Sequence, residues 1–292
     1  MFTEPVPGIN VTIRQVSPFI PHSYSETSFP TCCFHVDVEN VSYKSSEIDV
    51  SVMFSFENGY DVESARSDDN GNEITDKILH GPFSVNIEDG SGGSRVVGVC
   101  MTHTKHTKIK GKMIGGIWCP LGSQKGKDVH FADQGSFAIA TSDDHDSSDG
   151  SDVSFAEMMY VENSKNAGNF SFFSANRQES ATSSSKSYYS AKDVWDSFHN
   201  TGHLNNNMGN VEKQTVASNG HRRVAACICK HKTMKPLKHS NSNSNMLTYS
   251  FALSWDHPIA RFGSGMSVPR YYTRFFGDSG YTTSLIFSMN NS

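Results

Sequence analysis

Several features that would assign the chain to a specialised class of protein are scarce. No uninterrupted apolar run reaches the roughly 18 residues that a membrane-spanning helix needs. Lysine and arginine number 25 against 30 acidic residues, for a net charge of −5, and the one basic tract is the short KHTKIKGK at 105–112. This balance argues against a large basic surface for nucleic acid, and we expect no nucleic-acid partner.

Cysteine is sparse as well. Six cysteines in 292 residues are too few for a disulfide scaffold, and the adjacent Cys32 and Cys33 could not easily bridge each other. The start, MFTEPVPGINVT, has neither the basic region nor the apolar core of a signal peptide. These features predict reduced thiols and a cytoplasmic protein.

Alternation of apolar and polar residues dominates the chain. In EIDVSVMFSFENG every second residue from Ile48 to Phe56 is apolar, which places those side chains on one face of an extended strand. Gly, Asn, Ser and Pro clusters bound the segments of this kind, as expected for antiparallel strands joined by turns. Further segments alternate around residues 9–13, 34–38, 97–101, 137–139, 170–172 and 247–255.

The pattern predicts an all-β protein, an antiparallel two-sheet β-sandwich with one short helix and long Ser-, Asn- and Asp-rich loops. The helix is expected near 191–199, because Ser190 can cap it with Asp193 three residues on, and Gly202 can end it. Mobile loops are expected at 141–152, 178–190 and 238–245, whose composition cannot bury apolar surface.

Motifs for catalysis or for cofactor binding do not emerge from the residues. The nucleophile motif G-x-S-x-G is missing, the glycines of EDGSGGSRVVG miss the spacing of a phosphate-binding loop, and calcium-loop alignments on Gly71 and Gly150 lack the required carboxylates. The residues alone thus identify no catalytic residue, and we expect no cofactor and no metal in this chain.

Two cysteines in VAACICKH allow a metal site as an alternative. Cys227 and Cys229 share one face of the expected strand, and Cys32, Cys33 or His231 could complete a zinc site. The spacing differs from the C-x-x-C of zinc knuckles. Buried free thiols are the favoured interpretation.

Several blocks together resemble one enzyme family. PGINVTIRQVSPFIPHSYSETSFPTCCFHVDVEN (7–40), IDVSVMFSFENG (48–59), DVWDSFHNTGHL (193–204), YSFALSWDHPIARFG (249–263) and RYYTRFFG (270–277) are similar in order and spacing to the non-lysosomal glucosylceramidases, or bile-acid β-glucosidases, of glycoside hydrolase family 116. PTCCF stands where these enzymes usually carry small or aliphatic residues before the strand's Phe. The final DSGYTTSLIFSMNNS departs from the family pattern.

This resemblance implies an N-terminal β-sandwich over residues 1–277, incomplete at its start, and a tail at 278–292 where the family's linker to an (α/α)₆ catalytic barrel begins. The family's enzymes are retaining β-glucosidases that release glucose from glucosylceramide with a Glu nucleophile and an Asp acid/base, both in the barrel. The implied partners are that barrel and, for the whole enzyme, glucosylceramide. The implied location is cytoplasmic, free or peripheral on the cytosolic face of the ER, Golgi or plasma membrane.

Because the barrel is the expected neighbour, we predict that the arginine- and aromatic-rich stretch at the end of the matching blocks is an interdomain seam. Arginine and aromatic residues are enriched at buried contacts between proteins. An internal edge strand is the alternative. For the chain as a whole, an inactive accessory domain of the glucosidase is expected, with a non-catalytic β-sandwich that binds lipid, sugar or protein as the second hypothesis. The predicted seam consists of Asp256, Arg270, Tyr271, Tyr272, Arg274, Phe275 and Phe276.

Overall fold

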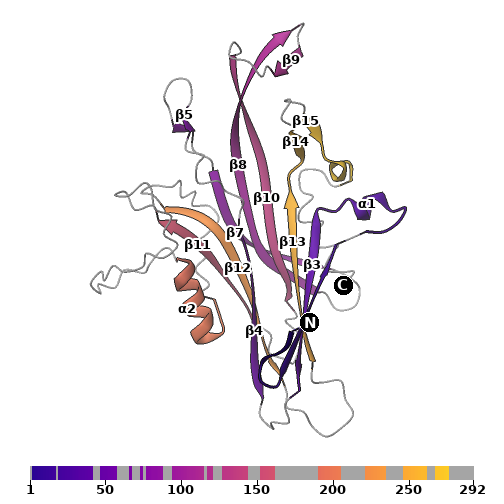
Figure 1. Cartoon of the computed structure of the whole chain (residues 1–292), viewed down its shortest axis with the longest axis vertical. Coiled ribbons are helices and arrows are strands. Elements are labelled where there is room, and N and C mark those ends of the chain that lie inside the picture. The colour runs from indigo at the N-terminus through magenta and orange to yellow at the C-terminus, as the bar shows by residue number, and fades with distance from the viewer. Residues whose placement is uncertain are drawn as a thin grey trace, which may run out of the picture.

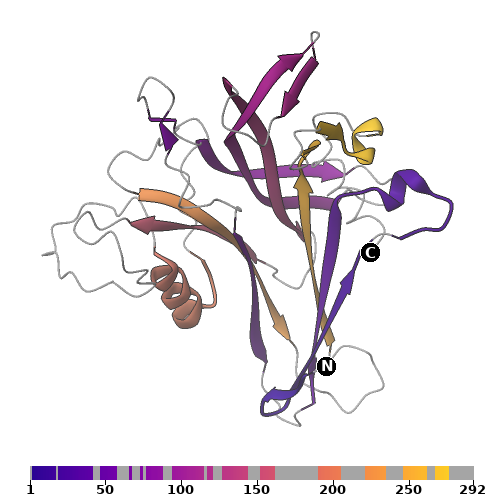
Figure 2. The ribbon, with the colours of Figure 1, turned by 45° about the horizontal axis from the view of Figure 1, so that its top comes forward.

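The computed structural model is an antiparallel β-sandwich of two unequal sheets (Figures 1 and 2). It describes residues 2–17, 19–41, 47–57, 66–67, 73–74, 77–87, 94–114, 117–120, 127–143, 152–161, 190–204, 221–234, 246–261 and 267–275. The expected fold class is confirmed.

The larger sheet, here called sheet A, has eight strands. Its order is β1 (Phe2–Val6), β2 (Ile9–Val16), β3 (Thr31–Asn40), β13 (Met246–Asp256), β10 (Lys127–Asp143), β8 (Ser94–Ile114) and β7 (Lys77–Ile87), and β9 (Ile117–Pro120) pairs with β8. All these pairings are antiparallel.

The smaller sheet, sheet B, has three strands in the order β11 (Asp152–Val161), β12 (His221–Met234) and β4 (Ile48–Glu57). Two short hairpins complete the described strands: β5 (Arg66–Ser67) with β6 (Glu73–Ile74), and β14 (Ile259–Arg261) with β15 (Ser267–Pro269). Strands adjacent in a sheet are often distant in the chain, as β3 and β13 are.

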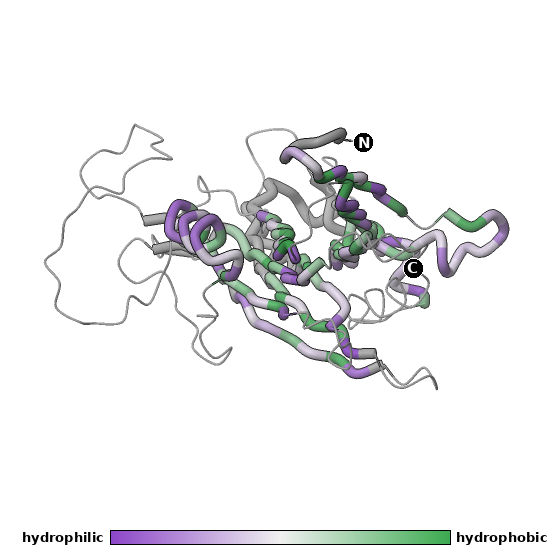
Figure 3. Tube along the Cα trace, turned by 90° about the horizontal axis from the view of Figure 1, so that it is seen from below, coloured by the Kyte–Doolittle hydropathy of each residue, from purple (hydrophilic) through white to green (hydrophobic). Residues whose placement is uncertain are grey.

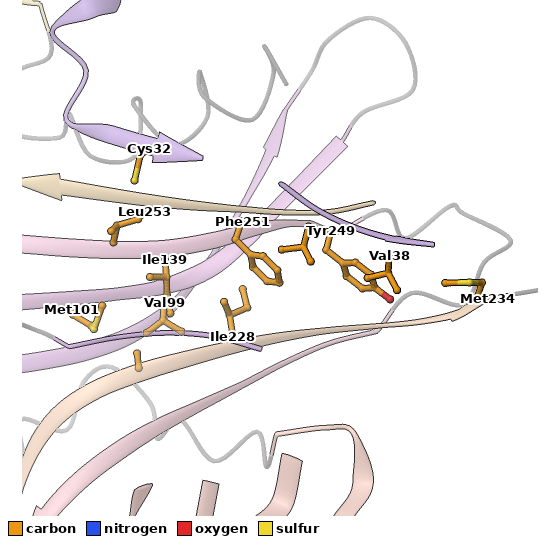
Figure 4. Packing of buried hydrophobic residues seen from close by; sticks show 12 residues of the cluster. Cys32, Val38, Val99, Met101, Ile139, Ile228, Met234, Tyr249, Phe251 and Leu253 are labelled. Atoms are coloured by element: carbon orange, nitrogen blue, oxygen red, sulfur yellow. The ribbon is translucent and has the colours of Figure 1, made fainter. Parts of the chain in front are cut away.

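The core lies between the sheets and follows from the alternation of each strand (Figure 3). Tyr249, Phe251 and Leu253 of β13 point toward β12, where Ile228 and Met234 face them (Figure 4). Phe251 stacks on Phe54 of β4 with ring centroids 5.8 Å apart. Burial of these large side chains is the main force holding the two sheets together.

One hydrogen bond also spans the layers. The hydroxyl of Tyr249, a fully buried residue of sheet A, donates to the carbonyl oxygen of Val50 in sheet B over 2.9 Å. Burial raises the pKa of this tyrosine, so it stays a neutral donor. The bond satisfies a polar group that would otherwise be costly inside the core.

The outer face of sheet A is built from small residues. Ala138, Ala140 and Ala252 are buried there with Cys33 and Val96, and Phe83 of β7 packs against them. Gly98 of β8 lies opposite Phe83 and Ala140 in the two neighbouring strands.

The outer face of sheet B is covered by helix α2 (Ala191–Thr201), as Figure 1 shows. The expected helix is confirmed, including its Ser190–Asp193 capping box and the left-handed Gly202 at its end. Val194 packs with Cys227 and Cys229, both fully buried. Within the described chain, no helix has the length and apolar character needed to cross a membrane.

Other expectations fall partly outside the description. The alternating segments predicted around 9–13, 34–38, 48–56, 97–101, 137–139 and 247–255 lie in β2, β3, β4, β8, β10 and β13. The segment around 170–172 and the loop at 238–245 are outside the described residues, as are 178–189 and 144–151. The two ends of the loop predicted at 141–152 are instead strand, because β10 runs to Asp143 and β11 begins at Asp152. Two single-turn helices were not predicted, α1 (Tyr24–Thr27) and the 3₁₀ turn η2 (Tyr271–Arg274).

Gly98→Ala should destabilise the sandwich. A Cβ at this position would lie 2.3 Å from the carbonyl oxygen of Ile139 and 2.7 Å from the ring of Phe83. We expect a loss of about 2–3 kcal/mol in the free energy of unfolding, measured by urea denaturation. Adding Phe83→Ala should not restore stability because the backbone clash persists. A loss below about 0.5 kcal/mol would contradict this packing.

The buried thiols under α2 should make the fold sensitive to alkali. Burial raises the pKa of Cys227 from 9.0 to about 12. The unfolded chain therefore loses this proton first, and stability falls as pH rises above about 9. Between pH 8 and 10 the thiol should account for a loss of about 1.4 kcal/mol. Urea denaturation at both pH values should show that the free energy of unfolding falls by that much more in the wild type than in Cys227→Ala. An equal fall in the two proteins would contradict the burial of this thiol.

Candidate functional site

A buried polar pair holds the C-terminal part of the predicted seam against the sandwich. The hydroxyl of Tyr272 donates to Oδ1 of Asp256 over 2.7 Å and accepts from the backbone N–H of His257 over 2.8 Å. Tyr272 is 4% exposed and Asp256 8%. Burial, followed by the neighbouring Asp256, raises the pKa of Tyr272, so the phenol remains a proton donor.

Backbone bonds fix the short helix in the same place. The N–H of Arg270 donates to the carbonyl of Pro258 over 2.8 Å, which ties the start of η2 to the residue immediately before β14. The hydroxyl of Thr273 donates to the Arg270 carbonyl over 2.7 Å. These bonds close the turn and determine which of its side chains face outward.

The outward side chains of η2 are aromatic and cationic. Tyr271 and Phe275 are 47% and 44% exposed, and their rings meet edge to face with centroids 5.4 Å apart. The guanidinium carbon of Arg274 lies 5.0 Å from the centre of the Tyr271 ring, a cation–π contact. Arg270 is also exposed. The turn thus presents a small, ordered patch to solvent.

The structure therefore divides the predicted seam into two sets. Asp256 and Tyr272 bond to each other inside the sandwich, whereas Arg270, Tyr271, Arg274 and Phe275 are exposed. Phe276 lies outside the described residues. Sequence alone could not separate the neighbours Tyr271 and Tyr272, because their directions are set by the tertiary bond to Asp256.

A second exposed apolar segment was missed by the sequence analysis. Phe19, Ile20 and Tyr24, in the connection between β2 and β3, are 80%, 45% and 70% exposed. The available signal was the SPFIPHSY stretch itself, in which apolar residues stand between two prolines without strand alternation.

Buried ionisable groups elsewhere are enclosed rather than open to a substrate. Nδ1 of His80 lies 3.7 Å from Oε2 of Glu157, and both residues are buried. Nζ of Lys230 donates to the carbonyl of Ser142 over 2.7 Å. By strand alternation Glu157 faces the core, while Asp256 faces the opposite side of sheet A. These two buried carboxylates cannot act as the facing pair of a glycosidase.

Histidines gather where α2 ends on sheet B. The rings of His203 and His231 have centroids 4.6 Å apart, and Nδ1 of His231 hydrogen-bonds with the Ser51 hydroxyl over 2.9 Å. Nδ1 of His203 lies 3.5 Å from Oδ2 of Asp152. In the part of the chain that the structure describes, no three His, Cys, Asp or Glu residues are arranged to hold a metal ion.

Tyr272→Phe tests the anchor. The change removes the hydroxyl that bonds both the buried Asp256 carboxylate and the His257 amide, so we expect the free energy of unfolding to fall by about 1–3 kcal/mol. The matched control is Tyr271→Phe in the exposed neighbour, which should change stability by less than about 0.5 kcal/mol. Equal losses in the two variants, measured by thermal or urea melts, would contradict the division of the seam.

Comparison with known protein families agrees with the blocks identified in the sequence. One family model matches residues 1–289 and is described as beta-glucosidase 2, glycosyl-hydrolase family 116 N-term. The match spans nearly all of the 292 residues, including β13, η2 and the segment between β2 and β3. The chain belongs to the family of N-terminal domains of glycosyl-hydrolase family 116, the beta-glucosidase 2 family.

Proposed function

We propose that this chain is the non-catalytic N-terminal domain of a β-glucosidase that cleaves glucosylceramide into glucose and ceramide. In this proposal residues 1–277 form the accessory sandwich, and 278–292 begin the connection to an (α/α)₆ barrel that carries the nucleophile and the acid/base. The whole enzyme acts in the cytoplasm or peripherally on the cytosolic face of a membrane that contains its lipid substrate.

The ordered patch on η2 carries this proposal. An isolated sandwich gains little by holding Tyr271, Arg274 and Phe275 in a fixed, exposed arrangement, whereas a domain interface uses these residue types as anchors. The buried bond between Tyr272 and Asp256 sets the patch in place before any partner arrives. Such preorganisation lowers the entropy cost of docking.

The sandwich supports the reaction by holding the barrel, not by supplying a reacting group. The buried described carboxylates face different sides of sheet A, as shown above, so the chemistry belongs to the partner domain in this account. Rigid β-strands suit a supporting role because their side chains are fixed by packing on both faces.

The purified 292-residue chain should be catalytically silent. Without the barrel it should not release glucose from glucosylceramide or cleave a chromogenic β-glucoside above the blank, because no nucleophile is available. The measurement is a coupled glucose assay at high protein concentration. Turnover that disappears on mutating one Asp or Glu of this chain would place the catalytic group within it and overturn the proposal.

Arg274→Ala should distinguish the free domain from the docked one. In the isolated chain the exposed guanidinium is hydrated, so the loss in stability should stay within about 0.5 kcal/mol. In the chain extended through the barrel, truncation would leave a partner charge unpaired at a cost of about 2–5 kcal/mol.

Both proteins are compared by thermal melts, with Lys192→Ala on α2 as the control. Lys192 is exposed and pairs with Asp196 on its own helix, so its removal should have the same small effect in both proteins. A large and equal loss for Arg274→Ala in both would mean that the arginine is bound within the sandwich.

A further inference from the structure

The connection between β2 and β3 displays three large apolar side chains to solvent, whereas Phe29 near its end is buried. Phe19 is 80% exposed and Tyr24 70%, and Ile20 lies beside them at 45%. Ile13 and Val16, which precede the segment in sequence at the end of β2, are also exposed. A concentration of exposed large apolar residues in one segment marks an interaction site more often than a random surface does.

Internal hydrogen bonds hold this segment in one shape. The hydroxyl of Thr27 accepts from the Ile20 N–H over 3.0 Å and donates to the Ile20 carbonyl over 2.9 Å. The Ser23 N–H donates to the same carbonyl over 3.1 Å. His22 takes a left-handed backbone, with φ of 66°, to complete the turn. The apolar side chains are therefore presented by a braced loop and not by a free tail.

The same end of β13 anchors this loop and η2. The carbonyl of Pro30, where the loop ends, accepts from the Trp255 N–H over 2.9 Å and from the Ser254 hydroxyl over 3.2 Å. The next two residues, Asp256 and His257, bond to Tyr272. Four consecutive residues thus hold both segments, and Figures 1 and 2 both show α1 and η2 at the same end of sheet A.

We propose that residues 19–27 and η2 form one composite docking surface, which inserts Phe19, Ile20 and Tyr24 into apolar recesses of the catalytic barrel. This inference rests on the proposed function and specifies what the partner must offer. Apolar recesses face the loop, and carboxylates face Arg270 and Arg274, which are exposed on η2. Contacts at both the loop and η2 would fix the orientation of the barrel, whereas a contact at one of them alone would leave the barrel free to rotate.

A protein partner fits the chemistry of the loop better than a lipid surface. The loop at 19–27 has the acidic Glu26 as its charged residue, so the loop itself lacks the lysine and arginine that a segment binding anionic membranes carries beside its apolar residues. The arginines of the composite surface, Arg270 and Arg274, lie on η2 and not in the loop. The loop is also continuous, through β13, with the arginine and aromatic patch of η2. A single protein domain can therefore contact both segments at once.

Amide hydrogen exchange tests the proposal directly. The 292-residue chain is compared with the same chain continued into the (α/α)₆ barrel of a family 116 β-glucosidase. We expect exchange in residues 19–24 and 271–275 to slow at least tenfold in the longer protein. Slowing at 271–275 alone would overturn the composite surface while leaving the proposed function intact. No slowing in either segment would contradict both.

A pair of matched variants gives a second readout. Phe19→Ser should abolish the slowing of exchange at 19–24. Trp195→Ser should leave that slowing unchanged, because Trp195 lies on α2, outside the proposed surface. Trp195 is a suitable control because it is also a large apolar side chain and is 55% exposed. Equal effects of the two variants would overturn the proposal. The proposal would also be overturned if phosphatidylcholine vesicles slowed amide exchange at 19–24 in the isolated chain and the barrel did not. That result would assign the loop to a membrane.

Discussion

Burial of strand β13 on both of its faces is the constraint on which the rest of the molecule depends. Its large side chains, Tyr249, Phe251 and Leu253, enter the core between the sheets, while Ala252 lies in the small-residue layer on the other side. A strand fixed from both sides has one register and one direction. Its last residues are therefore held in place, and the segments that bond to them inherit that position.

The surface at this end of sheet A is a product of those bonds. Pro30 joins the strand at Ser254 and Trp255, and Tyr272 joins it at Asp256 and His257. Each of these hydrogen bonds satisfies a polar group that packing would otherwise leave without a partner, so the anchors are stable parts of the fold. The exposed aromatic side chains next to the anchors then have fixed positions without being packed themselves. In the proposed accessory role, this preformed surface would orient the neighbouring domain.

Much of the fold could be predicted because strand alternation and helix capping depend on residues that are close in sequence. Alternation placed β4 and β13 correctly, and Ser190 with Asp193 predicted the start of α2. Pairing of strands such as β3 with β13 could not be predicted, because nothing in a strand's own pattern specifies a partner two hundred residues away. The interdomain seam stays a prediction, and the split of its residues into a buried Tyr272 and an exposed Tyr271 depends on a tertiary hydrogen bond that no sequence pattern shows. The braced loop depends on Thr27, seven residues from Ile20, and its apolar residues follow no strand or helix period.

The anchoring role of β13 is tested most directly by hydrogen exchange of two single amides in the free 292-residue chain, resolved by NMR. The N–H of Trp255 bonds to Pro30 and the N–H of His257 bonds to the Tyr272 hydroxyl. If both segments are fixed on the strand, these amides should exchange as slowly as that of Phe251 in the middle of β13, through global unfolding. Exchange of either amide at the rate of an unprotected residue would show that its segment is not held there, and the account of a preformed docking surface would fail.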